Sequence, residues 1–201
     1  MISTEEKSTR TRVDTETKLI RATAELLGEV GPNSLSIRAI AERAGVNHGL
    51  VHHYFGGKDA LLHAAMEHLV HEHHGYAMEN SRRQPYPEPF ALLGDPTYLR
   101  AVVRAVLDNE MSLARTELTE GVSVPRNVLM HLAQESGDAE PSVELKAKVG
   151  LAMAMEMGWA ALEPFILSVV DATTPDEQED VRRAARRIRK VVVEGMVDDD
   201  A

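Results

Sequence analysis

The fold of this chain is decided by residues 36–58, which read SIRAIAERAGVNHGLVHHYFGGK. Ser36 can cap one short helix, because a serine side chain at a helix start accepts a hydrogen bond from a free backbone N–H. Gly45 supplies the permissive backbone that a sharp turn between two helices requires. Asn47 can cap a second short helix. The pattern predicts a helix-turn-helix, a unit that presents its second helix to the major groove of DNA.

The same stretch resembles the DNA-binding region of the TetR family of bacterial transcriptional regulators. The resemblance runs from about Thr11 to Leu62, about a quarter of the chain, and several elements agree in order and spacing. It includes a following helix that begins with KDALL at 58–62, and a preceding helix that carries Ile20, Ala24, Leu27 and Gly31. A helical hairpin with a purely structural role is the alternative.

The resemblance implies that the helix starting at Asn47 enters the major groove. The residues expected to contact DNA are Ser36, Arg38, Asn47, His48, Gly49, Leu50, His52, His53, Tyr54 and Lys58. The chain departs from the family pattern at His52, where tyrosine is usual, at Leu50, where a small residue is frequent, and at Ala39, where an acid is frequent. Leu50 either contacts a thymine methyl group or belongs to the core, and the role of His52 stays open.

Three histidines in one recognition helix suggest that DNA binding depends on pH. A nearby phosphate favours the imidazolium form, so binding would strengthen as the pH falls towards 6. The alternative is that His48, His52 and His53 are neutral hydrogen-bonding groups.

The net charge of −10 is unevenly distributed along the chain. Residues 1–60 hold eight lysines and arginines against eight acids, whereas residues 61–201 hold 14 against 24. The excess acid lies outside the expected DNA-binding part, where it repels phosphate and helps to orient the molecule on DNA. The chain has no cysteine, which excludes disulfides, thiolate metal sites and cysteine redox sensing.

Helical signals account for the rest of the sequence. We expect an all-α protein of about nine helices, because neither strand patterns nor internal repeats occur. Besides the two short helices near 36–43 and 47–54, helices are expected at 10–30, 58–80, 96–118, 125–135 and 141–171 and from Thr174. Prolines between residues 81 and 96 predict an extended connector. The resemblance implies a helix-turn-helix DNA-binding domain at 10–57 and a helical ligand-binding and dimerisation domain at 58–201.

The helix expected at 141–171 is apolar almost all round, which predicts that it is buried. Its acids Glu156 and Glu163 lie on nearly the same face, which either reaches solvent or holds buried, paired carboxylates. Pro164 should kink the helix. The apolar stretch approaches the length of a membrane span, but these acids and the proline favour a soluble, cytoplasmic protein with no membrane contact.

The final helix carries an apolar stripe beside a dense run of basic residues. The basic run is either a solvated face or a second nucleic-acid site. The resemblance supports a homodimer, since the last two helices of family members form a four-helix interface. Such a dimer places two recognition helices about 34 Å apart. The expected interface residues are Trp159, Val181, Ala184, Ala185, Ile188, Val191 and Val192.

The resemblance also implies a small-molecule pocket between the C-terminal helices. An apolar lining rich in methionine adapts to irregular ligands. The expected lining residues are Met78, Tyr98, Met111, Met130, Met153, Met157, Trp159 and Phe165. Plain core packing is the alternative for each of them.

A cluster of histidines precedes the connector. His63, Glu67, His71 and His74 share one helical face, and pairs at this spacing can hold zinc, nickel or copper. The alternative is a polar helix face or a helix end.

These observations leave three hypotheses. The first is a DNA-binding regulator that needs no cofactor, by family expectation a repressor, and that a small, largely apolar ligand releases from a double-stranded operator. The second is a regulator that responds to metal at the histidine cluster. The third is a metal-dependent enzyme, which leaves the N-terminal match unexplained.

Overall fold

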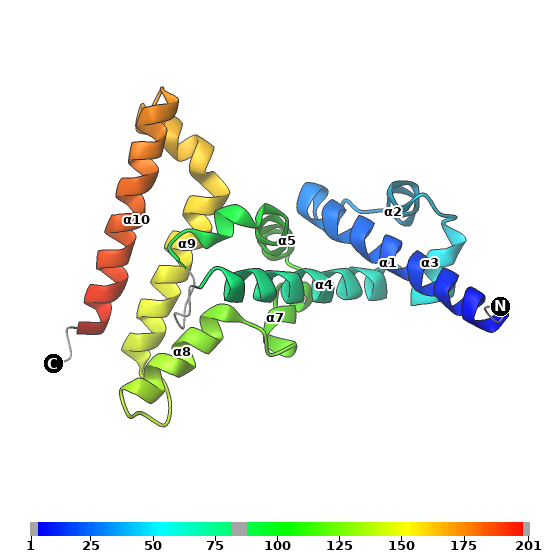
Figure 1. Ribbon diagram of the computed structural model, residues 1–201, viewed down its shortest axis with the longest axis horizontal. Coiled ribbons are helices and arrows are strands. Elements are labelled where there is room, and N and C mark those ends of the chain that lie inside the picture. Colours follow the sequence, from blue (N-terminus) through cyan, green and yellow to red (C-terminus); the bar gives the residue numbers. More distant parts are fainter. Residues whose placement is uncertain (1–3, 82–87, 199–201) are drawn as a thin grey trace. The chain divides into compact units, whose positions relative to one another are not determined.

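The computed structural model describes residues 4–81 and 88–198. Within these ranges the chain forms ten α-helices and one 3-10 helix, without a strand, so the predicted all-α fold is confirmed. The elements, coloured in chain order in Figure 1, are α1 Thr4–Val30, α2 Ile37–Ala44, α3 Gly49–Phe55, α4 Lys58–Glu79, η1 Ala91–Gly94, α5 Pro96–Leu107, α6 Met111–Ala114, α7 Thr116–Thr119, α8 Val124–Glu135, α9 Val143–Val169 and α10 Pro175–Asp198. Part of the predicted connector, residues 82–87, lies outside the described residues.

Contacts divide the chain into two compact units. The first unit comprises Met1–His73 and Thr97–Val122, and the second comprises His74–Pro96 and Ser123–Ala201. The helix-turn-helix therefore packs in one body with most of α4 and with the segment from α5 to α7. The functional division expected between residues 57 and 58 stays a prediction.

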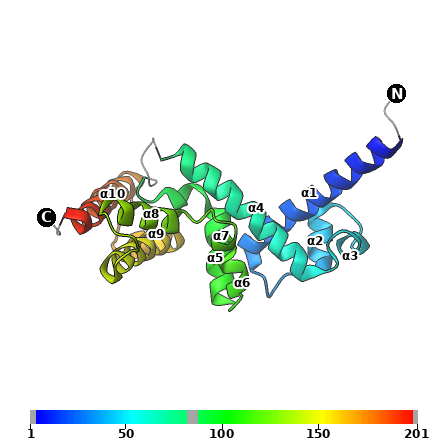
Figure 2. The same ribbon diagram turned by 90° about the horizontal axis from the view of Figure 1, so that it is seen from below.

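Apolar residues from the first four helices form the core beneath the helix-turn-helix. α2 packs alongside α1, as Figure 2 shows. The hydrophobic effect favours burial of these side chains, since each removes apolar surface from water. The largest of the fully buried members are Leu19, Leu27, Ile40, Val51, Leu61 and Met66.

Two helix boundaries predicted from the sequence are wrong. α1 begins at Thr4, earlier than the predicted start near residue 10. The single helix predicted at 96–118 is instead divided into α5, α6 and α7. Asn109 ends the first of these pieces because its backbone is left-handed, with φ at 63°. Asparagine is one of the few residues that adopt this conformation readily.

The C-terminal end of α1 is fastened by α5. Gly31 has a left-handed φ of 79°, which ends the helix as the sequence predicts. Arg104 Nε donates a hydrogen bond of 3.2 Å to the Gly28 carbonyl oxygen. The Asn33 backbone N–H donates one of 3.2 Å to the Asp108 carboxylate. Arg104 thus satisfies a carbonyl group that the end of the helix leaves open, and Asp108 binds the turn that follows.

The prediction that the helix at 141–171 is buried is wrong for the single chain. α9 packs on α8, α10 and η1 within the second unit, yet among its residues only Leu167 is buried. Leu151, Phe165 and Val169 are exposed by 58%, 66% and 66%. The neighbours that the same chain supplies cover too little of the apolar surface. Among the described helices, only α9 is long and apolar enough to cross a membrane, a property of length and composition alone.

The two acids of α9 are paired, and their side chains, Glu156 and Glu163, are 13% and 14% exposed. Glu156 accepts hydrogen bonds from the backbone N–H groups of Phe90 at 2.8 Å and Leu92 at 3.3 Å, and its Oε2 lies 3.1 Å from Arg189 Nε. Burial raises the pKa of Glu156, although Arg189 and these N–H groups act in the opposite direction. Glu163 accepts from Trp159 Nε1 and Arg182 Nε, both at 3.1 Å.

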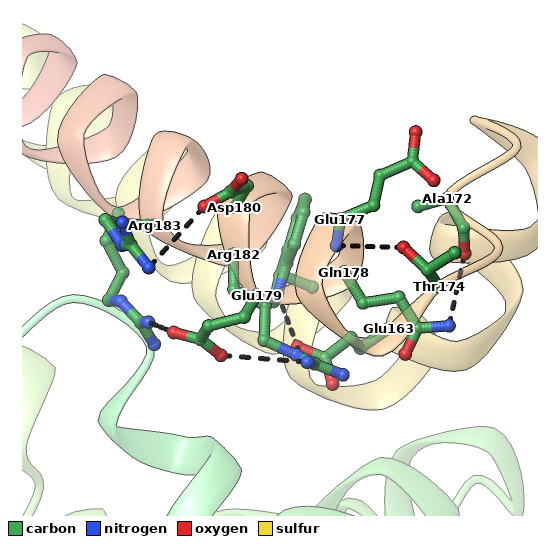
Figure 3. Close-up of polar contacts among 11 residues, drawn as sticks. Glu163, Ala172, Thr174, Glu177, Gln178, Glu179, Asp180, Arg182 and Arg183 are labelled. Carbon is green, nitrogen blue, oxygen red and sulfur yellow. Dashed lines mark hydrogen bonds and ion pairs between the residues drawn. The ribbon is translucent and has the colours of Figure 1, made fainter.

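α10 starts after Thr174, as expected from the sequence, and the Thr174 side chain caps it. Figure 3 shows the Glu177 N–H donating to Thr174 Oγ1, at 3.2 Å. The Glu177 carboxylate reaches back to the Thr173 N–H at 3.1 Å, one residue before the position that a capping box predicts.

Candidate nucleic-acid interface

Local capping sets the geometry of the helix-turn-helix. Ser36 Oγ accepts a hydrogen bond of 3.1 Å from the Ala39 N–H at the start of α2. Gly45 ends α2 with a left-handed φ of 66°. Asn47 Oδ1 accepts a hydrogen bond of 2.8 Å from the Gly49 N–H at the start of α3. The predicted capping roles of Ser36 and Asn47 are confirmed, and both side chains retain a donor that DNA could use.

The recognition helix α3 presents a polar face over an apolar anchor. Val51 is fully buried and holds the helix on the core. Leu50 and Tyr54 are half-buried, at the edges of this anchor. The exposed residues at the start and along the outer face are Asn47, His48, Gly49, His52 and His53. This face offers several donors and acceptors, the groups that base edges and phosphates bind.

Three cations lie near α3 and differ in whether acidic side chains of the protein bind them: Arg38, Arg43 and Lys58. Arg38 is exposed in the first turn of α2, and Lys58 is the first residue of α4. Arg43 is instead held by Glu29 at 2.8 Å and Glu25 at 3.0 Å. These hydrogen bonds raise the pKa of Arg43, and Arg43 lowers the pKa of Glu29. The charge of Arg43 is therefore compensated within the protein, whereas Arg38 and Lys58 suit phosphate contacts.

One cation at this surface was missed by the sequence analysis. The guanidinium carbon of Arg12, on α1, lies 5.7 Å from the centroid of the Tyr54 ring, on α3. The Tyr54 ring also meets the His53 ring edge to face, with centroids 4.8 Å apart. No sequence pattern relates residue 12 to residue 54, because the contact depends on how α1 crosses α3.

Comparison with known proteins agrees with this geometry. Residues 19–65 match the profile of the bacterial regulatory proteins of the tetR family. The regulator BetI 1 of Chromohalobacter salexigens is 35% identical over 102 residues, which cover 51% of this chain and 45% of that protein. The transcriptional repressor Rv3405c of Mycobacterium tuberculosis is 29% identical over 168 residues, 83% of this chain and 84% of that one.

Solved structures extend the likeness to nearly the whole chain. A TetR-family protein from Rhodococcus sp. is similar with a TM-score of 0.58 at 20% identity, over 90% of this chain and 99% of that one. GusR of Salmonella enterica is similar with a TM-score of 0.56 at 16% identity, over 91% and 95%.

Residues 19–65 match the TetR family of DNA-binding transcriptional regulators.

The chain spans about half the length of BetI 1 and most of the length of Rv3405c. The curated proteins that it matches are transcriptional regulators, which supports the regulator hypothesis over the metal-dependent enzyme.

Three histidines of α4 have partners within the first unit. His71 Nε2 lies 3.1 Å from Glu120, and His68 pairs with Glu72 at 3.4 Å. His73 is buried and stacks on Tyr98, with ring centroids 3.9 Å apart. Over the ranges that the structure describes, no group of three or more His, Cys, Asp or Glu residues could hold a metal ion. The proposed face His63, Glu67, His71 and His74 is not assembled as a metal site.

The expected pocket residues do not all belong to one unit. Tyr98 and Met111 lie in the first unit, where the Tyr98 hydroxyl donates to Glu117. Trp159 stacks on Phe90, with ring centroids 5.1 Å apart. Among the other candidates, Met157 is half-buried, whereas Phe165 is 66% exposed. The second unit holds Met78, Met130, Met153, Met157, Trp159 and Phe165. Their role in ligand binding stays a prediction.

The apolar stripe of α10 is partly exposed in the single chain. Ile188 and Val191 are 61% and 68% exposed, whereas Val181, Ala184 and Ala185 are half-buried. The side chain of Val192 lies outside the described residues.

Four arginines of the basic run of α10 pair with acids on the same unit, which disfavours a second nucleic-acid site: Arg182, Arg183, Arg186 and Arg189. Figure 3 shows Arg182 with Glu163 and Glu179, and Arg183 with Asp180. Arg186 pairs with Glu179 at 2.8 Å, and Arg189 faces Glu156.

Proposed function

We propose that this protein binds a palindromic DNA operator as a homodimer and represses transcription until a small, largely apolar ligand releases it. The observation that carries the proposal is the recognition helix α3, which has a polar, exposed outer face and a buried anchor at Val51. Two cations, Arg38 and Lys58, flank this helix in the sequence and structure. Phosphate contacts on both sides would fix the register of the helix in the groove.

The DNA contacts follow from residue chemistry. His48 and His52 lie four residues apart on one face, where their ring nitrogens would meet base edges. Gly49 has no side chain, so the helix backbone would approach the DNA closely. Lys58 stands at the N-terminus of α4, where its ammonium and the helix dipole would both attract a phosphate.

The exposed apolar surface of α9 and α10 supports the homodimer. Several large apolar side chains exposed on two packed helices are typical of an interaction site. Phe165, Val169, Ile188 and Val191 are each more than half exposed in the single chain. We expect Ile188→Asp to convert a dimer into a monomer in analytical ultracentrifugation, because an unpaired carboxylate would be buried at the interface.

Release by a ligand would be a shift between conformations. A ligand that binds better to a conformation with wrongly spaced recognition helices lowers the affinity for the operator. In this scheme residues 10–57 bind DNA, residues 58–201 bind the ligand and the second protomer, and α4 connects the two functions. A regulator of this kind acts where the bacterial chromosome is, in the cytoplasm.

Binding to DNA from the region upstream of the protein's own gene, measured by fluorescence anisotropy, tests the proposal. Lys58→Ala should weaken binding to all duplexes and reduce the salt slope by about one per protomer. His48→Ala should cost about 1–3 kcal/mol on the preferred sequence and little on random sequence.

The matched control is Lys146→Ala, which removes an exposed lysine of α9 and should leave binding unchanged. No salt-sensitive binding to this region or to a randomised library would contradict the proposal.

A further inference from the structure

Arg12 lies outside the helix-turn-helix but contacts the recognition helix. Its guanidinium carbon is 5.7 Å from the centroid of the Tyr54 ring, within the range of a cation–π interaction. The Arg12 side chain is nevertheless 64% exposed. Tyr54 in turn touches His53, an exposed residue of the α3 face. A positive charge is thus presented to solvent beside the face that would meet DNA.

Within the free protein, Arg12 is held by one acid. Arg12 Nε donates a hydrogen bond of 2.8 Å to Glu16 Oε1, one helical turn later. Arginine is always charged in proteins, and this hydrogen bond raises the pKa of Arg12 further. Exposed pairs of this kind contribute little stability, and the order in which the cation precedes the acid is the weaker one on a helix. Arg12 can therefore exchange Glu16 for a stronger anion at small cost.

Arg12 differs from Arg43 in that its guanidinium can still bind a second anion. Arg43 is bound by two glutamates, one of them through two parallel hydrogen bonds to Glu29. Arg12 has the single partner Glu16 among the described residues, which leaves its terminal NH2 groups for a second anion. Guanidinium groups bind phosphate in the same two-pronged way as carboxylate.

We propose that Arg12 binds a DNA phosphate beside the groove segment that α3 enters, that Tyr54 positions its guanidinium, and that Glu16 competes with the phosphate for it. This inference rests on the proposed DNA binding. It adds a contact from α1, and it assigns to Glu16 a role that weakens binding.

The test compares Arg12→Ala, Glu16→Gln and the double variant of the full-length protein. The probes are a random-sequence duplex and the duplex that selection from a randomised library enriches, titrated by fluorescence anisotropy at several salt concentrations. Arg12→Ala should weaken both duplexes about two- to fivefold per protomer, the range for an exposed ion pair. It should also reduce the salt slope by about one per protomer.

Glu16→Gln should strengthen binding by up to about the same factor, and only when Arg12 is present. The matched control is Asp14→Asn, which removes an exposed acid from the same turn of α1. Circular dichroism melting establishes that each variant folds.

The inference is overturned if Arg12→Ala binds DNA with the affinity and the salt slope of the wild type. It is also overturned if Glu16→Gln strengthens binding as much in the Arg12→Ala background as in the wild type. A gain in affinity from Asp14→Asn equal to that from Glu16→Gln would contradict it as well. If the wild type binds neither duplex, the proposed function fails first and the inference fails with it.

Discussion

Replacing Arg189 by methionine removes the cation that faces Glu156 while keeping a similar apolar volume. The side chains of Glu156 and Arg189 are only 13% and 14% exposed. Removing one partner of a buried ion pair leaves the other charge uncompensated, which costs about 3–5 kcal/mol. Glu156 keeps its hydrogen bonds from the Phe90 and Leu92 N–H groups in the variant. We therefore expect Arg189→Met to lower the free energy of unfolding by the lower end of this range, about 3 kcal/mol at pH 8.

The cost of Arg189→Met should depend on pH. Burial already raises the pKa of Glu156, and loss of Arg189, which acts to lower it, raises it further. A group with a raised pKa binds its proton more tightly in the folded state, so its contribution to stability grows as the pH falls. The stability that protonation of Glu156 contributes reaches its full value below the ordinary glutamate pKa of about 4.3. The variant should therefore lose clearly less stability at pH 5 than at pH 8.

Urea unfolding followed by circular dichroism, at fixed protein concentration, measures these differences. The double variant Glu156→Gln, Arg189→Met buries no charge and should lie within about 1 kcal/mol of the wild type. The matched control, Arg183→Met, breaks an exposed pair with Asp180 on the same helix and should cost under about 0.5 kcal/mol. An equal cost for Arg189→Met and Arg183→Met, or a cost of Arg189→Met that is the same at pH 5 and pH 8, would refute the reasoning.

Three further predictions concern the first unit and α4. Ser36→Ala removes the cap of α2 and should lower the free energy of unfolding by about 1 kcal/mol in the same urea experiment, whereas Ser36→Asn should restore it. Gly31→Ala forces a left-handed residue and places a Cβ 2.9 Å from Asp108 Oδ2, which should cost about 1–3 kcal/mol. Its control, Gly75→Ala, meets nothing within 4 Å in a helix interior and should stabilise by about 0.5–1 kcal/mol, and a loss there would contradict the argument. Operator affinity at fixed salt should rise as the pH falls from 8 to 6 if a nearby DNA phosphate favours the imidazolium form of the α3 histidines, and an affinity that does not change with pH would exclude this linkage.

Local signals in the sequence were enough to predict much of the fold. The caps Ser36 and Asn47 and the glycine turn at Gly45 are properties of a few neighbouring residues, and the structure confirms each of them. The Thr174 start of the last helix is a signal of the same kind. Such signals act through backbone groups within three residues, so they are visible without tertiary information.

Features that depend on packing between distant segments could not be predicted. The sequence shows neither that Arg43 is held by Glu25 and Glu29 nor that Arg12 lies over Tyr54, because both contacts cross between helices. The apolar pattern of α9 predicted burial, and a pattern cannot say whether the cover comes from the same chain. The break at Asn109 was missed because asparagine is also tolerated within helices.

Selection of duplexes from a randomised library, by the wild type and by His48→Ala, tests most directly whether α3 reads DNA. The wild type should enrich a palindrome whose half-sites are centred about one helical turn apart. His48→Ala should lose sequence preference at discrete positions in each half-site and keep it elsewhere. No enriched sequence, or the same enriched sequence for both proteins, would contradict the account.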